Sequence, residues 1–126
     1  MKLIPEWHNH DRCLIAWPCN LELYKSQIHS ARKEIANLAN QIAEEEPVYI
    51  YCNSQDLKDC RLTISNQEIS IIEVDLDDSW MRDIAPIFYK EDKELRSINF
   101  NFNGYGKYPN YKNDNLLSDI ICDQFR

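Results

Sequence analysis

The sequence predicts an α/β fold, and two observations lead to this prediction. One long segment, residues 21–43, repeats apolar side chains at steps of three and four, which is typical of an amphipathic helix that covers another layer. Short runs rich in β-branched and aromatic residues lie before and after it. Because 126 residues with 44% hydrophobic and 28% charged side chains suit one folded domain, a disordered or collagen-like chain is excluded.

The long helix has recognisable end signals. Asn20 is a suitable N-cap, and Pro47 prevents the helix from continuing. The same apolar stripe would fit a coiled-coil seam, but a strand-like run follows it, so we expect the stripe to pack on a sheet. The stripe consists of Leu21, Tyr24, Ile28, Ala31, Ile35, Leu38 and Ile42.

Five β-rich runs are the expected strands. They are residues 13–17, 48–52, 69–74, 86–89 and 95–102. In the last run, alternation places Ile98, Phe100 and Phe102 on one face. The charged residues 90–94 then form the turn of a hairpin.

A second helix is expected at the end of the chain. Asp114 is its candidate N-cap. Its apolar residues lie on one side and are Leu116, Leu117, Ile120, Ile121 and Phe125. Because no helix-stop residue follows them, we expect residues 1–126 to be a truncated part of a larger domain.

Charge and hydropathy restrict the partners and the location. The 14 Lys and Arg residues against 21 Asp and Glu give a formal charge of -7, which disfavours nucleic acid and favours a cationic small molecule. No run approaches the roughly 20 apolar residues of a membrane span, and the first residues lack the apolar core of a signal peptide. We therefore expect a cytoplasmic protein with no membrane partner.

The cysteines and histidines do not form a convincing metal or disulfide pattern. The five cysteines are Cys13, Cys19, Cys52, Cys60 and Cys122. Their odd number and scattered spacing predict free thiols, some of them buried as small core residues. His8, His10 and Asp11 near Cys13 suggest a transition-metal cluster, but such residues more often serve as caps and hydrogen-bond partners. We expect no metal and no cofactor.

The strongest chemical signal is an acidic loop that follows the run at residues 69–74. Its carboxylates are Glu73, Asp75, Asp77, Asp78 and Asp83. Asp75, Asp77 and Ser79 imitate the start of a calcium loop, but Trp80 and Pro86 replace the glycine and glutamate that such a loop needs. A solvated acidic turn is the structural alternative. Trp80 favours a ligand, because carboxylates and an indole together suit a planar cation.

Both glycines of the chain, Gly104 and Gly106, fall within residues 102–109. This concentration predicts positive φ angles or a close approach at one turn. A tight turn after a strand and a loop that closes over a ligand would each explain the two glycines, and these residues alone do not distinguish the two explanations.

Three segments together resemble the agmatine deiminase and bacterial, Porphyromonas-type peptidyl-arginine deiminase family of guanidino-group modifying enzymes. They are Pro5-Glu6-Trp7-x-x-His10 followed by Ala16-Trp17-Pro18, then Asp77-Asp78-Ser79-Trp80-Met81-Arg82-Asp83-Ile84-Ala85-Pro86, and finally Phe102-Asn103-Gly104-Tyr105-Gly106-Lys107-Tyr108. Their order and spacing resemble the N-terminal third of such an enzyme across the whole chain. The third segment departs from the family pattern by having Tyr105 where Trp is common.

The resemblance implies a pentein fold, a propeller of five ββαβ units, of which this chain would form roughly two. It implies a hydrolase acting on C–N bonds that converts agmatine and water to N-carbamoylputrescine and ammonia, a reaction of putrescine biosynthesis. In the family, a cysteine thiolate attacks the guanidino carbon, a histidine moves protons and carboxylates bind the nitrogens.

The resemblance also implies roles for four residues. By motif position, Asp83 is the expected catalytic carboxylate that binds the guanidinium. Trp80 is the expected wall of the substrate pocket, and Asp78 is a further substrate-binding carboxylate. Arg82 is expected to orient neighbouring carboxylates, because a cationic side chain would repel a cationic substrate.

The family's nucleophilic cysteine and catalytic histidine lie beyond the part that this chain resembles. We therefore expect an N-terminal fragment that does not turn over alone. Its exposed sheet edges and apolar faces would favour self-association or binding of a complementary C-terminal fragment.

Other functions are compatible with the same residues. The full-length form could act on peptidyl-arginine or free arginine, because both share the guanidinium. The acidic loop and Trp80 could instead form a non-catalytic module that binds a cationic amine. In a purely structural alternative, the helix over residues 21–43 docks a partner protein.

Overall fold

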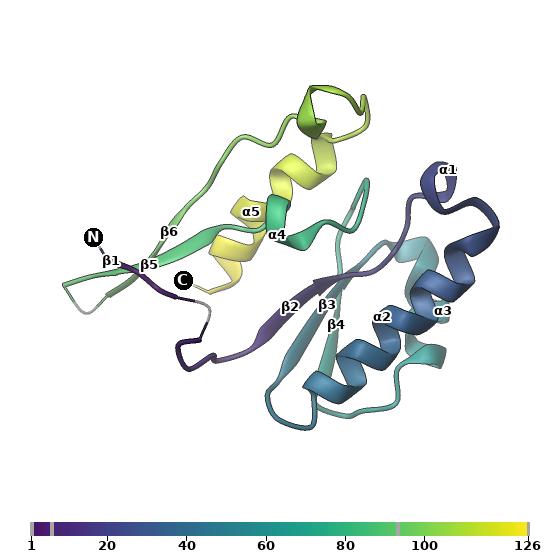
Figure 1. The fold of residues 1–126 in the computed structure, drawn as a ribbon, viewed down its shortest axis with the longest axis horizontal. Helices are drawn as coiled ribbons and strands as arrows, with labels where there is room; N and C mark the ends of the chain where they lie inside the picture. Colours follow the sequence, from purple (N-terminus) through teal and green to yellow (C-terminus); the bar gives the residue numbers. More distant parts are fainter. Residues whose placement is uncertain (1, 6, 93, 126) are drawn as a thin grey trace. The chain divides into compact units, whose positions relative to one another are not determined.

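The computed structural model describes residues 2–5, 7–92 and 94–125. The chain divides into two compact units, one formed by His10–Met81 and the other by Met1–Asn9 with Arg82–Arg126. Each unit contains one three-stranded sheet with helices beside it (Figure 1). The predicted α/β fold class is therefore confirmed.

The sheet of His10–Met81 is parallel and has the order β2-β3-β4. Its strands are β2 (Cys13–Ala16), β3 (Val48–Cys52) and β4 (Ile69–Glu73). All three runs were predicted as strands to within a residue or two. Parallel neighbours require crossover connections, and helices between the strands provide them.

The helices of this unit are α1 (Leu21–Tyr24), α2 (Ile28–Ile42) and α3 (Leu57–Thr63), with short 3-10 turns η1 (Lys25–Gln27) and η2 (Ser54–Asp56). Asn20 is the predicted cap, since its Oδ1 accepts a hydrogen bond from the Leu23 amide at 3.0 Å. The prediction of one continuous helix was wrong. Lys25 has a φ of 48° and interrupts the helix before α2 begins.

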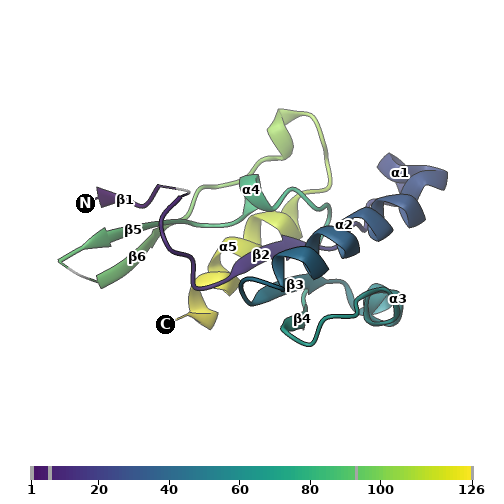
Figure 2. The ribbon, with the colours of Figure 1, turned by 60° about the horizontal axis from the view of Figure 1, so that its bottom comes forward.

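The core of the unit lies between one sheet face and the helices α2 and α3, which can be followed in Figures 1 and 2. The buried residues are Ile15, Trp17, Ala36, Ala39, Ala43, Val48, Ile50, Cys52 and Cys60. The predicted stripe was only partly right, because Leu21 and Leu38 are 61% and 48% exposed. Ile35 and Ile42 of the stripe pack against the core, and Ala36 and Ala39 complete the contact because their small side chains let α2 approach the sheet closely.

Substituting alanine for both Ile28 and Ile35 is expected to lower the free energy of unfolding by about 2 kcal/mol or more. Ile28 is 6% exposed and Ile35 packs against the core, so both changes leave unfilled space. Urea unfolding followed by circular dichroism measures the loss. Leu38→Ala on the same helix is the control and should change stability little. A stable double variant that has lost a protein partner would instead support the docking role of this helix.

The second unit has an antiparallel sheet with the order β1-β5-β6. Its strands are β1 (Lys2–Leu3), β5 (Ile87–Glu91) and β6 (Glu94–Ile98). The predicted hairpin is confirmed by the pairing of β5 with β6. Lys93 of the expected turn lies outside the described residues. The two residues of β1 were not predicted, because so short a strand has no detectable alternation.

The predicted strand over residues 95–102 was too long. Ile98 pairs with Ile87, the first residue of β5, and Pro86 before it has no amide hydrogen to continue the ladder. Beyond this point the Phe102 amide donates to Asn115 Oδ1 at 2.7 Å. Phe100 is consequently 63% exposed and does not share a strand face with Ile98.

The second unit also contains α4 (Met81–Ile84), a 3-10 turn η3 (Gly104–Gly106) and α5 (Lys112–Gln124). The final helix is confirmed, but Asp114 is not its cap. The helix begins two residues earlier, and Asp114 is a buried residue of its first turn with 2% exposure. Leu117 and Ile121 are fully buried, whereas Leu116 and Ile120 on the same helix are exposed.

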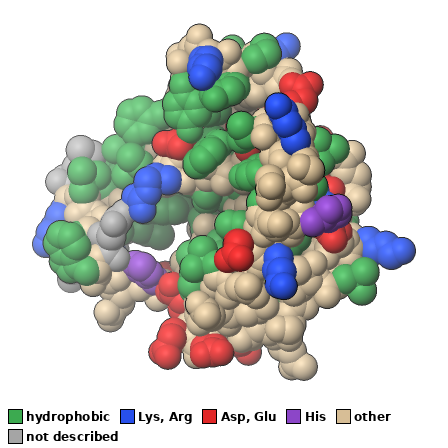
Figure 3. Space-filling model, turned by 45° about the vertical axis from the view of Figure 1, so that its right-hand side comes forward, with side chains coloured by type: hydrophobic (Ala, Val, Ile, Leu, Met, Phe, Trp, Pro, Cys, Tyr) green, Lys and Arg blue, Asp and Glu red, His purple; other side chains and the backbone are tan. Residues whose placement is uncertain are grey.

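Apolar side chains reach the surface in both units. Among the residues described, Trp7, Leu62 and Phe100 are 87%, 77% and 63% exposed. A space-filling view shows groups of hydrophobic side chains at the surface (Figure 3). In the described part of the chain, no helix is long and apolar enough to cross a membrane.

Candidate guanidinium-binding site

Asp78 and Trp80 lie in the loop that follows β4. The Trp80 Nε1 donates to Asp78 Oδ2 at 3.0 Å, and Asn20 Nδ2 donates to the same oxygen at 3.2 Å. The other oxygen, Oδ1, accepts from the Ser79 amide at 2.8 Å. The indole of Trp80 is 48% exposed. Asp78 therefore fixes the orientation of an indole that still presents part of its surface to solvent.

The loop is anchored at two further points. Asn53, directly after β3, accepts from the Leu76 amide at 2.7 Å through Oδ1 and donates to the Leu76 carbonyl at 3.1 Å through Nδ2. The Tyr24 hydroxyl lies 3.0 Å from Ser79 Oγ. The role of Asn53 was not predicted. A polar residue directly after a buried strand was the available indication, since sites in α/β proteins gather at such strand ends.

Asp83 is exposed on α4 and belongs to the other unit. Its Oδ2 accepts a hydrogen bond from the Tyr105 hydroxyl at 2.5 Å. The structure thus brings Trp80 together with Asp78, and Asp83 together with Tyr105. Arg82 is exposed on α4. The roles in binding or orientation predicted for Asp78, Trp80, Arg82 and Asp83 stay predictions.

Tyr105 lies in η3, where the prediction of positive φ angles is confirmed. Gly104, Tyr105 and Gly106 have φ values of 63°, 59° and 68°. A Cβ added to Gly104 would lie 3.1 Å from Tyr111 Cδ1, so a side chain there would be crowded as well as strained by the positive φ. Tyr105 has no such freedom and adopts a strained backbone conformation.

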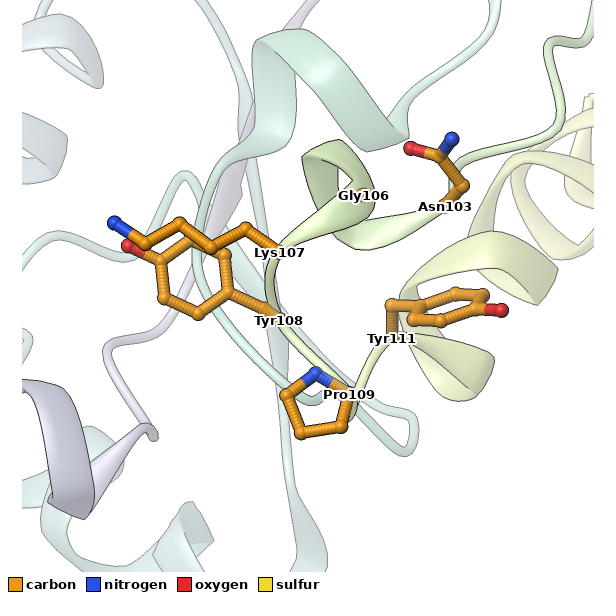
Figure 4. Close-up of a pocket in the computed structure, with 6 residues that line it drawn as sticks. All are labelled: Asn103, Gly106, Lys107, Tyr108, Pro109 and Tyr111. Carbon is orange, nitrogen blue, oxygen red and sulfur yellow. The ribbon is translucent and has the colours of Figure 1, made fainter.

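A surface pocket of about 390 Å³ lies next to η3 (Figure 4). Its lining residues are Asn103, Gly106, Lys107, Tyr108, Pro109 and Tyr111. The Lys107 Nζ is 5.2 Å from the centre of the Tyr108 ring, and in the close-up the lysine chain runs beside that ring. This cation already occupies the aromatic face that a guanidinium would use, so the pocket is a poor guanidinium site.

The five cysteines are free thiols, as predicted, and four of them are buried. Burial, with a smaller contribution from Glu46, raises the pKa of the Cys13 thiol. A hydrogen bond with Cys60, together with burial, raises the pKa of the Cys52 thiol far above its ordinary value. A catalytic cysteine needs the opposite shift, because the thiolate is the nucleophile.

Alkylation of Cys13 by iodoacetamide is expected to be slow at pH 7 and to accelerate only above the pH at which free cysteine reacts. Its raised pKa lowers the thiolate fraction of the folded chain at neutral pH. Mass spectrometry of peptides after timed alkylation measures the rate, with the urea-unfolded chain as the control. Fast modification of folded Cys13 at pH 7 would contradict the raised pKa.

Each of the two N-terminal histidines lies within hydrogen-bond distance of an oxygen atom. His10 Nδ1 lies 3.4 Å from Glu46 Oε1, and His8 Nδ1 lies 3.2 Å from the Asn9 carbonyl. Within residues 2–5, 7–92 and 94–125, no group of three or more His, Cys, Asp or Glu side chains is arranged to hold a metal ion.

Solved structures share the fold. The agmatine deiminase of Enterococcus faecalis superposes with a TM-score of 0.91 at 22% identity, over 98% of this chain and 35% of that chain. The agmatine deiminase of C. jejuni with substrate bound superposes with a TM-score of 0.77 at 23% identity, over 98% of this chain and 36% of that chain. The fold is therefore that of part of a pentein.

The sequence then identifies the family. The family model of the Porphyromonas-type peptidyl-arginine deiminases matches residues 2–126, so this chain belongs to that family. A relative from Mycoplasma capricolum is 31% identical over 124 residues, which cover 94% of this chain and 34% of the relative. The chain thus spans about a third of the length of this relative and corresponds to its N-terminal portion.

Proposed function

We propose that this chain is the N-terminal, substrate-binding part of a cytoplasmic agmatine deiminase. The complete enzyme would hydrolyse agmatine to N-carbamoylputrescine and ammonia. The family match over residues 2–126 carries the proposal, because it includes the segment at residues 77–86 that supplies the proposed binding residues. Five free cysteines suit a reducing compartment such as the cytoplasm.

The proposed substrate contacts begin with Asp83. Its carboxyl group is exposed, and a guanidinium can bind a carboxylate with two parallel N–H donors. Trp80 would contribute the pocket wall, since its half-exposed indole can lie against a flat cation. The hydrogen bonds from Asn20, Trp80 and the Ser79 amide orient Asp78, which supports a role in holding the indole alongside the predicted contact with substrate. Arg82 would orient the carboxylates.

The proposed chemistry needs groups from outside these 126 residues. A thiolate would attack the guanidino carbon, ammonia would leave after protonation, and water would hydrolyse the thiouronium-like intermediate. The raised pKa values of Cys13 and Cys52 argue against either as that thiolate. The nucleophilic cysteine and the acid–base histidine would therefore come from a complementary C-terminal part, and this chain alone would not turn over.

Agmatine is the proposed substrate because its two positive charges suit a chain with a formal charge of -7. Peptidyl-arginine and free arginine are the alternatives, and they differ from agmatine only beyond the shared guanidinium.

Calorimetry of the 126-residue chain tests this proposal. Agmatine should bind saturably, putrescine should bind more weakly because it lacks the guanidinium, and no ammonia should form. Stronger binding of an arginine-containing peptide than of agmatine would favour the peptidyl-arginine alternative. Absence of agmatine binding, or ammonia release by this chain alone, would overturn the proposal.

A further inference from the structure

We propose that Tyr105 is a positioning residue whose hydroxyl orients the Asp83 carboxylate for guanidinium binding. The inference rests on the proposed function and adds to it a residue outside the segment at residues 77–86. Both side chains belong to the same compact unit.

The first observation is the hydrogen bond itself. The Tyr105 hydroxyl donates to Asp83 Oδ2 at 2.5 Å, a distance typical of an O–H donor and an ionised carboxylate. A carboxylate has about four lone-pair positions, and the phenol uses one of them. Asp83 Oδ1 and the second position on Oδ2 are enough for the two parallel N–H donors of a guanidinium. Tyr105 can thus orient the carboxylate without displacing the substrate.

The second observation is the backbone that presents the phenol. Tyr105 has a φ of 59°, a conformation that is costly for a residue with a bulky side chain. Such strain persists only where the surrounding structure imposes it, and it occurs preferentially at functional sites. The Lys107 and Tyr108 amides donate to the Gly104 carbonyl at 3.0 Å and 2.9 Å, and these hydrogen bonds hold the turn closed.

The third observation is the packing of the ring. Phe102 meets the Tyr105 ring edge-on with 5.1 Å between centroids, and Tyr108 does so at 6.3 Å. Edge-to-face pairs restrict the plane of a ring, so these two contacts favour the orientation in which the hydroxyl meets Asp83. Helix α4 has only four residues and orients Asp83 weakly by itself. Tyr105 is 53% exposed, but its ring has two aromatic neighbours, so we assign the phenol as the group that positions the carboxylate.

A purely structural role is the competing explanation, in which the hydrogen bond only ties η3 to α4. Tyr105→Phe removes the hydroxyl and keeps the ring contacts, which makes it the decisive variant. Tyr108→Phe is the matched control, because it removes a hydroxyl from the neighbouring ring in the same loop. Three measurements on the 126-residue chain separate the roles: agmatine affinity by calorimetry, the carboxyl ¹³C resonance of Asp83, and hydrogen exchange of the Lys107 and Tyr108 amides.

We expect Tyr105→Phe to weaken agmatine binding about tenfold, as the loss of a hydrogen bond to a charged group predicts. The Asp83 carboxyl resonance should shift, and amide exchange in the loop should stay at the wild-type rate. Tyr108→Phe should leave all three unchanged. Unchanged agmatine affinity in Tyr105→Phe, or a loss accompanied by faster loop exchange, would overturn the positioning role while the proposed function stands. Failure of the wild-type chain to bind agmatine would overturn both.

Discussion

Asp83→Asn is expected to reduce ammonia release from agmatine by about a thousandfold, equivalent to about 4 kcal/mol of transition-state stabilisation. The amide is neutral and cannot offset the charge of the guanidinium, and it loses one of the two acceptor oxygens. Its remaining oxygen still accepts the hydrogen bond that Tyr105 now donates to Asp83 Oδ2. The variant therefore removes the charge and leaves the local fold in place. The measurement is kcat/KM of a longer polypeptide, in which residues 1–126 are joined to the C-terminal part that is proposed to supply the cysteine and the histidine.

Asp92→Asn is the matched control for this experiment. Asp92 is an exposed aspartate of the hairpin turn with a φ of 50°, a conformation that asparagine also tolerates. It should leave turnover at the wild-type level. If Asp83→Asn also retained wild-type turnover, the assignment of Asp83 as the guanidinium-binding carboxylate would be wrong.

Arg32→Ala is expected to lower the free energy of unfolding by about 3–5 kcal/mol, a large share of the stability of an ordinary domain. Arg32 is 8% exposed on α2. Its Nε donates to the Pro18 carbonyl at 2.9 Å, and its two terminal nitrogens lie 2.7 Å from Asp56 Oδ1 and 2.8 Å from Asp59 Oδ2. One guanidinium thus joins the end of β2, the helix α2 and the start of α3.

The carboxylates that Arg32 leaves behind cause most of this loss. The second oxygen of Asp56 is buried and has no hydrogen-bond partner among the described residues, so the guanidinium is what compensates this charge. Thermal unfolding and urea titration measure the effect, with Lys33→Ala at the exposed neighbouring position as the control. Adding Asp56→Asn to Arg32→Ala should recover part of the stability. A loss below about 1 kcal/mol would show that water replaces the guanidinium at low cost.

Local patterns in the sequence were sufficient for most of the secondary structure. The three parallel strands, the hairpin and the final helix all follow from apolar periodicity, because side chains alternate along a strand and recur every three or four residues along a helix. Asn20 could also be identified as a cap from the sequence, because the hydrogen bond that its side chain accepts from the Leu23 amide spans only three residues. The motif at residues 77–86 was equally local, and it indicated the family that the comparisons establish.

The failures fall where distant segments meet. Periodicity could not show that Ala36 and Ala39, rather than Leu38, would face the sheet, because the rotation of α2 depends on how closely it packs. Nor could it distinguish the buried Arg32 from a solvated arginine, since Asp56 lies 24 residues away.

The sequence by itself determined the fold class, the family and the set of candidate site residues, because each follows from the spacing of residues within one element or motif. Only the tertiary structure decided which side chains act on which. The partner of Asp83 is 22 residues away at Tyr105, and Asp78 is held by Asn20 from 58 residues away. Such pairs form because the packing of whole elements brings them within hydrogen-bond distance, and no local pattern encodes that distance.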